Sequence, residues 1–251
     1  MIKDAVNLKF VASFTKKPLI RNALKYHTLI EQLMGIIFDL DGTLSDSLYF
    51  HSKFIKKVLD KELGTNKVKL DVIKRHIRVP LNRFFPYLSI RYGLDLSAEE
   101  CSRIMQLKDS YITPADVKRV KLFPGVLKLI KLLKHDAIKI AIATSMNSKE
   151  LSMFIPSLKL HGISRTIINS PSFLKDKPNP YIINTAIRLT GMNKGRTVYI
   201  GDSIYDAEAA WRARVKFIGI HNPELAASSL FFRDEYSLYH YIKKHINAFR
   251  D

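Results

Sequence analysis

The segment Phe38-Asp39-Leu40-Asp41-Gly42-Thr43-Leu44 decides the fold and directs the search for a function. It follows the apolar run 35–37 and places two carboxylates two residues apart, where a strand is expected to end. Side chains at i and i+2 of an extended chain point to the same side, so Asp39 and Asp41 can face one site. Because two such carboxylates repel each other, the pair favours a bound cation. Taken alone, residues 39–42 are more typical of a plain turn after a buried strand.

The same pattern recurs twice further along the chain. Residues 139–143 lead into Thr144-Ser145, and residues 197–201 lead into Asp202-Ser203. Each is a short, mostly apolar segment that ends at polar groups and precedes helical patterning, which is typical of strands in a parallel sheet buried on both faces. Ligands of α/β folds bind beyond the carboxyl ends of the strands, where all three polar ends would meet. The sequence therefore predicts an α/β fold with one site at that edge.

Four motifs occur in order over residues 35 to about 220. They read Asp39-Leu40-Asp41-Gly42-Thr43, Ile140-Ala141-Ile142-Ala143-Thr144-Ser145, Lys177-Pro178-Asn179-Pro180 and Gly201-Asp202-Ser203-Ile204-Tyr205-Asp206-Ala207-Glu208-Ala209-Ala210. Together they resemble the motifs of the haloacid dehalogenase superfamily, in the branch of phosphoglycolate phosphatase and β-phosphoglucomutase. A single motif of this kind arises by chance, but four in order do not. The resemblance implies a Rossmann-like parallel sheet core flanked by helices, with an inserted α-helical cap domain, and phosphatase activity.

The resemblance also implies roles for three of the aspartates. Asp39 is the expected nucleophile, which attacks phosphorus and forms an aspartyl-phosphate that water then hydrolyses. Asp41 is expected to protonate the leaving oxygen and later to deprotonate the attacking water. The Asp39 carboxylate, the Asp41 backbone carbonyl and the Asp202 carboxylate are the expected ligands of Mg²⁺, which prefers oxygen ligands in octahedral geometry.

The remaining motif residues are expected to bind the phosphoryl group or to support the site. The Thr144 hydroxyl and the Ser145 backbone N–H would hold phosphoryl oxygens. Lys177 would offset the accumulated negative charge, and Asp206 would support the site without binding the metal directly. Plainer interpretations exist for each: a strand-end hydroxyl for Thr144, a solvated lysine for Lys177, and a first-turn helix residue stabilised by the dipole for Asp206.

The segment from Asp46 to about Lys121 breaks the strand–helix alternation and is predicted to be helical. The expected helices cover residues 47–63, 68–77 and 81–92, with another that opens at Ser97-Ala98-Glu99-Glu100 in a capping-box pattern. The chain then divides into an amino-terminal extension (1–33), a core domain (34–46 and 121–251) and a helical cap domain (47–120). In relatives, such a cap closes over the site and excludes bulk water from it.

Substrate choice is expected in the cap, where the family's GxPL-like turn is replaced by Arg78-Val79-Pro80-Leu81. The basic side chains near this turn are Arg75, His76, Arg78 and Arg83. They either recognise a second anionic group of the substrate, such as a carboxylate or phosphate, or form a solvated helix face. A further departure is Arg214, where relatives commonly carry glycine; an arginine with positive φ would be strained there.

The first 33 residues are basic and precede a natural start at Met34-Gly35. Asp4 and Lys9 interrupt the apolar stretch that a secretory signal needs, so that interpretation is rejected. We rank a targeting segment, or upstream sequence from a misassigned start codon, above a docking or regulatory helix. Cys101 is the only cysteine, which excludes an intrachain disulfide and agrees with a cytoplasmic location. Charges interrupt every apolar run well short of the roughly 20 residues of a membrane span, so no membrane partner is expected.

The net charge of +18 raises an alternative from another class, a polyanion- or nucleic-acid-binding protein on the same fold. The basic residues are spread along the chain without a basic–aromatic cluster, so no dedicated nucleic-acid partner is expected. We predict a Mg²⁺-dependent phosphatase of a small phosphorylated metabolite: phosphoglycolate, a sugar phosphate or a nucleoside monophosphate. A phosphomutase of the β-phosphoglucomutase type shares every motif, whereas a dehalogenase would have no use for Asp41. The oligomeric state stays open.

Overall fold

The computed structural model describes residues 30–246, except residues 65, 95, 173–174 and 228. Most of the predicted extension, residues 1–29, therefore lies outside the described residues. Its last residues belong to the core: Ile30 and Leu33 are buried in the main hydrophobic cluster. The carbonyl oxygen of Gln32 also accepts a hydrogen bond of 2.8 Å from Arg196 Nε. The core thus includes residues that precede Met34, the expected start of the core domain.

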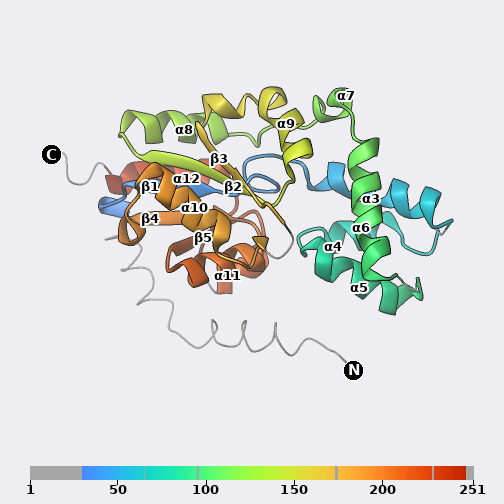
Figure 1. The fold of residues 1–251 in the computed structure, drawn as a ribbon. Helices are drawn as coiled ribbons and strands as arrows, with labels where there is room; N and C mark the ends of the chain where they lie inside the picture. Colours follow the sequence, from blue (N-terminus) through green and yellow to red (C-terminus); the bar gives the residue numbers. More distant parts are fainter. Residues whose placement is uncertain (1–29, 65, 95, 173–174, 228, 247–251) are drawn as a thin grey trace.

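Within the described residues, a six-stranded parallel sheet forms the centre of the larger lobe (Figure 1). In spatial order its strands are β3 (Thr166–Asn169), β2 (Lys139–Thr144), β1 (Gly35–Phe38), β4 (Thr197–Gly201), β5 (Lys216–Ile220) and β6 (Leu230–Phe232). The three predicted strands are confirmed as β1, β2 and β4, which lie side by side at the centre. All residues of β1 and β4 are buried, as expected for strands covered on both faces.

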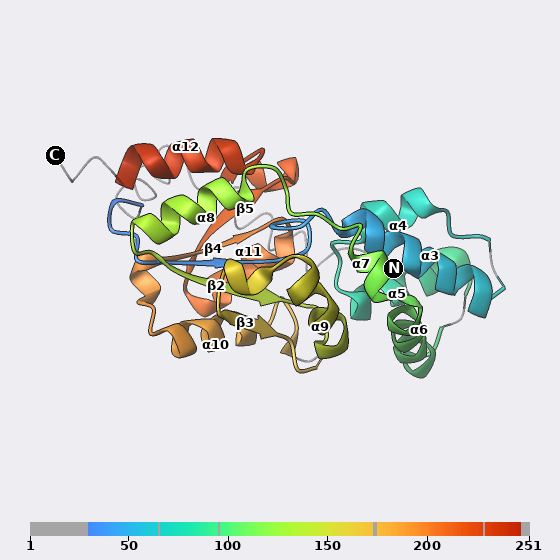
Figure 2. The ribbon, with the colours of Figure 1, turned by 90° about the horizontal axis from the view of Figure 1, so that it is seen from above.

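Helices cover both faces of this sheet (Figure 2). One face carries α8 (Val126–His135) and α12 (Glu235–Ile246), and the other carries α10 (Tyr181–Thr190) and α11 (Ile204–Ala213). Ile36 belongs to the first of the two hydrophobic clusters and Ile37 to the second, because successive side chains of a strand point to opposite faces. Among the described residues, the core also includes α9 (Ser148–Ser157), η1 (Leu160–Gly162), η3 (Lys194–Arg196) and η4 (Pro223–Ala227). The predicted α/β architecture is confirmed.

A second, helical lobe lies between β1 and α8 in the sequence (Figure 1). Its helices are α3 (Leu48–Glu62), α4 (Leu70–His76), α5 (Leu81–Tyr92), α6 (Ala98–Tyr111) and α7 (Pro114–Val117). Helices α3 to α6 bury a cluster of their own around Ile55, Phe84 and Leu88, whereas Val117 of α7 packs in the main cluster of the core. Ser97 and Glu100 form the predicted capping box at the start of α6. Because α3 to α6 have a separate core, we propose 47–120 as the bounds of the cap domain, with α7 as the segment that returns to the core. None of the described helices is long and apolar enough to cross a membrane.

Arg214 directly follows the last residue of α11, and its φ of 59° lies in the left-handed region. Strain was predicted at this position if φ were positive, and the structure confirms that φ is positive. A non-glycine residue in this conformation costs roughly 1–2 kcal/mol. The sharp turn from α11 into β5 is therefore kept despite a local penalty.

Candidate active site

Strands β2 and β3 lie on one side of β1, and β4 and β5 lie on the other, so the strand order reverses direction at β1. In an open parallel sheet, this reversal creates a crevice at the carboxyl ends of the strands. The register places Phe38 opposite both Ile142 and Ile200, so the three strands end at almost the same level. Asp39 follows β1 directly and Asp202 follows β4 directly, so both carboxylates lie in that crevice.

A cavity of about 470 Å³ lies between this sheet edge and the cap. The expected site residues that line it are Asp39, Asp41, Ser145, Lys177, Asp202 and Asp206. The cap contributes further residues to its wall, including Arg78 from the turn before α5 and Lys108 from α6. The structure thus brings the motif residues to one place and sets the cap lobe directly against them.

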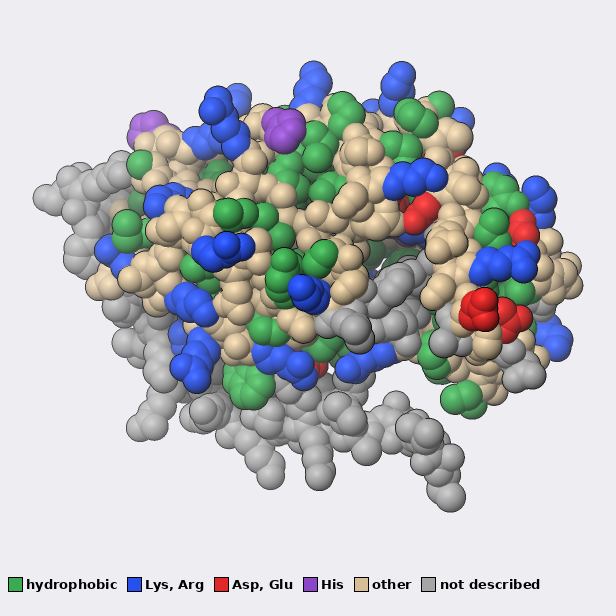
Figure 3. Space-filling view, viewed as in Figure 1, with side chains coloured by type: hydrophobic (Ala, Val, Ile, Leu, Met, Phe, Trp, Pro, Cys, Tyr) green, Lys and Arg blue, Asp and Glu red, His purple; other side chains and the backbone are tan. Residues whose placement is uncertain are grey.

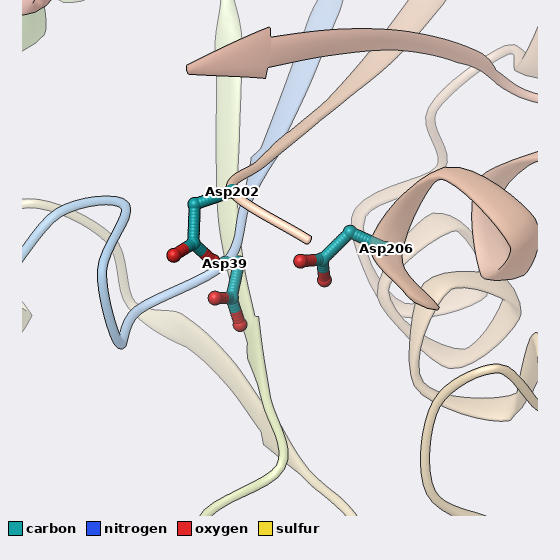
Figure 4. A group of neighbouring side chains, drawn as sticks. All are labelled: Asp39, Asp202 and Asp206. Carbon is teal, nitrogen blue, oxygen red and sulfur yellow. The ribbon is translucent and has the colours of Figure 1, made fainter. Parts of the chain in front are cut away.

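Three buried aspartates form the centre of the site (Figure 4). Asp39 and Asp202 come from the strand ends and Asp206 from α11, and each offers a carboxylate oxygen within 4.8 Å of the others. Burial raises the pKa of Asp39 well above its usual range, and the neighbouring carboxylates add to this, although Lys177 opposes it. Burial likewise raises the pKa of Asp202 to about 6. The cluster therefore holds more negative charge than its surroundings stabilise.

Lys177 is the buried cation of this cluster. Its Nζ donates hydrogen bonds to Asp39 Oδ1 at 2.6 Å and to Asp206 Oδ1 at 2.8 Å. Burial opposes its charge, but the attraction of Asp206 and Asp39 outweighs this and raises the pKa of the ammonium well above its usual range. The interpretation of Lys177 as a solvated surface lysine is therefore wrong, because its side chain is only 9% exposed.

Asp206 is already held by protein donors. Its Oδ1 also accepts a hydrogen bond of 3.0 Å from the Tyr199 hydroxyl, and its Oδ2 accepts bonds from the Ser203 backbone N–H and hydroxyl. The Ser203 bonds complete a capping box at the start of α11. Asp206 thus lies in the first turn of a helix, as its plainer interpretation expects, and also bonds Lys177; its supporting role in catalysis stays a prediction. Gly201 is needed beside it, because a Cβ there would lie 2.6 Å from Asp206 Cβ.

The donor set fits a divalent cation such as Mg²⁺. Asp39 and Asp202 offer hard carboxylate oxygens, and a cation between them would offset the cost of their burial, which is the main cause of their raised pKa values. The backbone next to Asp41 passes close by, since a Cβ added to Gly42 would lie 2.3 Å from Asp202 Oδ2. Gly42 also has a φ of 77°, a conformation that glycine adopts without strain. The chain after β1 therefore depends on glycine to approach this carboxylate.

Asp41 has a partner that the sequence analysis missed. Its Oδ1 lies 2.9 Å from His51 Nε2 and also accepts a hydrogen bond from the Ser47 hydroxyl. On the other side of the ring, His51 Nδ1 lies 3.2 Å from Glu150 Oε1, an ion-pair distance without hydrogen-bond geometry. Burial opposes protonation of His51, yet Asp41 and Glu150 outweigh it and raise its pKa to about 9. The imidazole also stacks on Phe154, at 5.8 Å between ring centroids.

A sequence signal for His51 did exist. Ser47 and His51 are four residues apart at the start of α3, so their side chains share a helix face with i,i+4 spacing. Both face the carboxylate of the first motif. The apolar residues around His51 hid this signal, because they favour the interpretation of a helix buried in the cap.

The two polar residues after β2 differ in their surroundings. Thr144 is fully buried, and its hydroxyl accepts a hydrogen bond of 3.1 Å from Met146 N, which matches the plainer interpretation of a strand-end hydroxyl. Ser145 lines the cavity and donates its hydroxyl to Asp176. Binding of phosphoryl oxygens by either residue stays a prediction.

The structure reduces the predicted group of basic cap residues to one. Arg78 lines the cavity, and its Nε donates a hydrogen bond of 2.6 Å to Asp202 Oδ2. Arg75 and His76 instead contact backbone carbonyls of their own helix, and Arg83 lies over the Tyr205 ring. Of these four, only Arg78 is a candidate for contact with an anionic substrate group.

Comparisons with known proteins agree with this fold. Residues 36–220 match the family model of haloacid dehalogenase-like hydrolases. A phosphoglycolate phosphatase of Rhodobacter capsulatus is 30% identical over 185 residues, which cover 73% of this chain and 82% of the relative. A hydrolase structure from Pseudomonas syringae superposes with a TM-score of 0.71 at 26% identity, over 84% of this chain and 98% of the other. A putative β-phosphoglucomutase structure from Thermotoga maritima shares the fold at 22% identity, with a TM-score of 0.62 and coverage of 84% and 99%.

Proposed function

The chain belongs to the haloacid dehalogenase-like hydrolases, and from this premise we propose that it is a Mg²⁺-dependent phosphatase that acts through an aspartyl-phosphate on Asp39. The placement of Asp39 is the observation that carries this proposal. This carboxylate lies at the carboxyl end of the central strand, is hydrogen-bonded to Lys177 and faces Asp202. Asp41 follows two residues later in the wall of the same cavity.

In the first proposed step, a carboxylate oxygen of Asp39 forms a bond to phosphorus as the ester P–O bond breaks. Asp41 gives its proton to the leaving oxygen. In the second step, Asp41 takes a proton from water, which attacks the same phosphorus and releases inorganic phosphate and free Asp39. Lys177, anchored by Asp206, offsets negative charge throughout without having to reorganise.

Asp39, Asp202 and the backbone carbonyl of Asp41 would hold the Mg²⁺. When bound, the ion supplies positive charge that stabilises the transferring phosphoryl group. The residues themselves set the geometry, because Gly42 allows the backbone to approach Asp202 and Lys177 keeps Asp39 in place.

We further propose that the substrate is a small phosphate ester with a second anionic group, as in 2-phosphoglycolate. Two observations support this: the name of the Rhodobacter capsulatus relative, and the position of Arg78 in the cavity wall. A cavity of about 470 Å³ is of a size suited to a small molecule. Figure 3 shows Lys and Arg side chains spread over the visible face. They do not form there the single dense basic patch that is typical of a dedicated nucleic-acid site.

The test is hydrolysis of p-nitrophenyl phosphate and 2-phosphoglycolate with Mg²⁺ and with excess EDTA. Wild type is compared with Asp39→Asn and with Asp46→Asn as a matched control, because Asp46 is exposed and lies outside the cavity. We expect turnover that needs Mg²⁺, is lost in Asp39→Asn and is retained in Asp46→Asn. Turnover that survives in Asp39→Asn would contradict the aspartyl-phosphate route. Conversion of a sugar phosphate into its isomer without phosphate release would favour the phosphomutase alternative.

A further inference from the structure

A chain of buried charged side chains connects the cap to Asp41. Lys108 of α6, a cap helix, donates through Nζ to both carboxylate oxygens of Glu150 at 3.2 and 3.3 Å. Glu150 lies in the first turn of α9, a core helix, and its Oε1 is 3.2 Å from His51 Nδ1. His51 in turn contacts Asp41 at 2.9 Å. The charges alternate in sign from the cap to the acid–base carboxylate.

The burial of this chain calls for an explanation. Lys108 is 7% exposed, Glu150 2% and His51 8%. Lys108 is also within 3.4 Å of Asp109 Oδ1, so its ammonium lies between two carboxylates. Apolar residues at such positions often give equal or better stability than buried ion pairs. Stability alone therefore does not explain these buried charges, and their role lies in the side-chain position that they fix.

The contacts of His51 show which position that is. Its ring stacks on Phe154 and faces Glu150, and both of these residues belong to α9. Helix α9 therefore fixes where the imidazole lies, although His51 itself belongs to α3. Lys108 reaches Glu150 from α6, at the far end of the cap sequence. The Lys108–Glu150 contact therefore joins the cap to the core, and Glu150 in turn contacts His51, the partner of Asp41.

We propose that Lys108 and Glu150 are positioning residues for Asp41: Lys108 docks the cap on Glu150, and Glu150 holds His51 against the Asp41 carboxyl group. This inference rests on the proposed phosphatase function, because it assigns Asp41 the acid–base role. With the cap docked, the carboxyl group is aligned to pass its proton to the leaving oxygen. Without the Lys108–Glu150 contact, His51 loses a restraint and Asp41 is less often aligned.

The test compares substrates that need this proton to different degrees. The leaving group of an alkyl phosphate such as 2-phosphoglycolate is a basic alkoxide unless its oxygen is protonated. The leaving group of p-nitrophenyl phosphate is a stabilised phenolate. The ratio of their kcat/KM values reports the first chemical step. A positioned general acid contributes about 100-fold or more, so Lys108→Met and Glu150→Gln are expected to lower the ratio of alkyl to aryl kcat/KM by about tenfold or more.

Two further variants sharpen the result. Lys108→Arg keeps the positive charge and is expected to restore most of the ratio. Lys56→Met is the matched control, because Lys56 pairs with Asp60 within α3 and takes no part in the chain of contacts. Its ratio is expected to stay within about twofold of wild type, as for a surface pair of little energetic weight.

An active wild type whose variants lose both activities in proportion would overturn this inference alone. A folded wild type without phosphatase activity would overturn it together with the proposed function. Thermal unfolding tests the contact without reference to activity: Lys108→Met and Glu150→Gln should lower Tm by amounts that do not add in the double variant. Additive losses would show that the two side chains are not coupled, and would also overturn the inference.

Discussion

Replacement of Lys177 by methionine is expected to destabilise the protein in a pH-dependent way. Methionine has a similar length, so the change mainly removes the ammonium that bonds Asp39 and Asp206. Both carboxylates are almost fully buried and would lose their shared cation. Removal of one partner from a buried ion pair costs about 3–5 kcal/mol, and we adopt the lower value because the carboxylates can take up a proton instead.

The pH dependence follows from the pKa of Asp39, which burial already raises in the folded protein. Loss of Lys177 removes the effect that lowers this pKa, so it rises further. Between the unfolded and folded pKa values, the folded state binds more protons, so stability falls as pH rises through that interval. The deficit of Lys177→Met is therefore expected to be largest near neutral pH and to shrink as the pH falls toward 5.

The assay is thermal unfolding in EDTA at several pH values, with Lys175→Met as the matched control. Lys175 is two residues away and exposed, and its ammonium lies over the face of the Tyr181 ring, 4.7 Å from the ring centroid. For a chain of this size, a loss of about 3 kcal/mol lowers Tm by about 6–12 °C, whereas the control should lose about 3 °C or less. Equal Tm values for the two variants at neutral pH would refute the reasoning.

Three further changes test other parts of the site. Gly42→Ala places a Cβ 2.3 Å from Asp202 Oδ2 and should lower p-nitrophenyl phosphate turnover about 100-fold. Gly64→Ala is the control, because Gly64 also has a positive φ but lies in open space, and this variant should retain turnover. Glu150 has a pKa of about 2 because its cationic neighbours outweigh burial, so it contributes stability above about pH 4.5 that is lost toward pH 2. Denaturant titrations from about pH 5 to 3 should show a steeper loss for wild type than for Glu150→Gln; parallel curves would contradict the assignment. Arg78→Gln should raise KM for 2-phosphoglycolate about tenfold or more and change that for p-nitrophenyl phosphate less, whereas equal changes would exclude a substrate-specific contact.

The central sheet and the motif residues were predictable because they depend on local patterns. Apolar runs that end at Asp39 and Asp202 indicate parallel strands whose ends meet, and no knowledge of the distant packing is needed. Helix 81–92 was predicted with both its bounds, since Gly93 ends it with a φ of 60°. The bounds of α3 and α4 differed by one or two residues, as is usual where helix ends fray.

The contacts around Asp41 were not predictable in the same way. His51, Glu150 and Lys108 lie on three helices separated by long stretches of sequence, and each residue taken alone fits a solvated or structural position. Contact between these side chains depends on how the cap packs on the core, and no local periodicity in the sequence indicates that arrangement. The same holds for Ile30 and Leu33, whose burial depends on packing against distant elements.

The position of β1 at the centre of the sheet has a consequence for synthesis on the ribosome. Gly35 pairs with Lys139 on one side and with Thr197 on the other, so both edges of this apolar strand wait for partners made more than a hundred residues later. At about 5–20 residues per second, that wait lasts several seconds or longer. An unpaired apolar strand invites association with other chains during this time. The cap, made in between, can complete its own core around Ile55 before β1 has a neighbour, so the nascent protein is expected to carry a folded helical lobe beside a strand that a chaperone would bind.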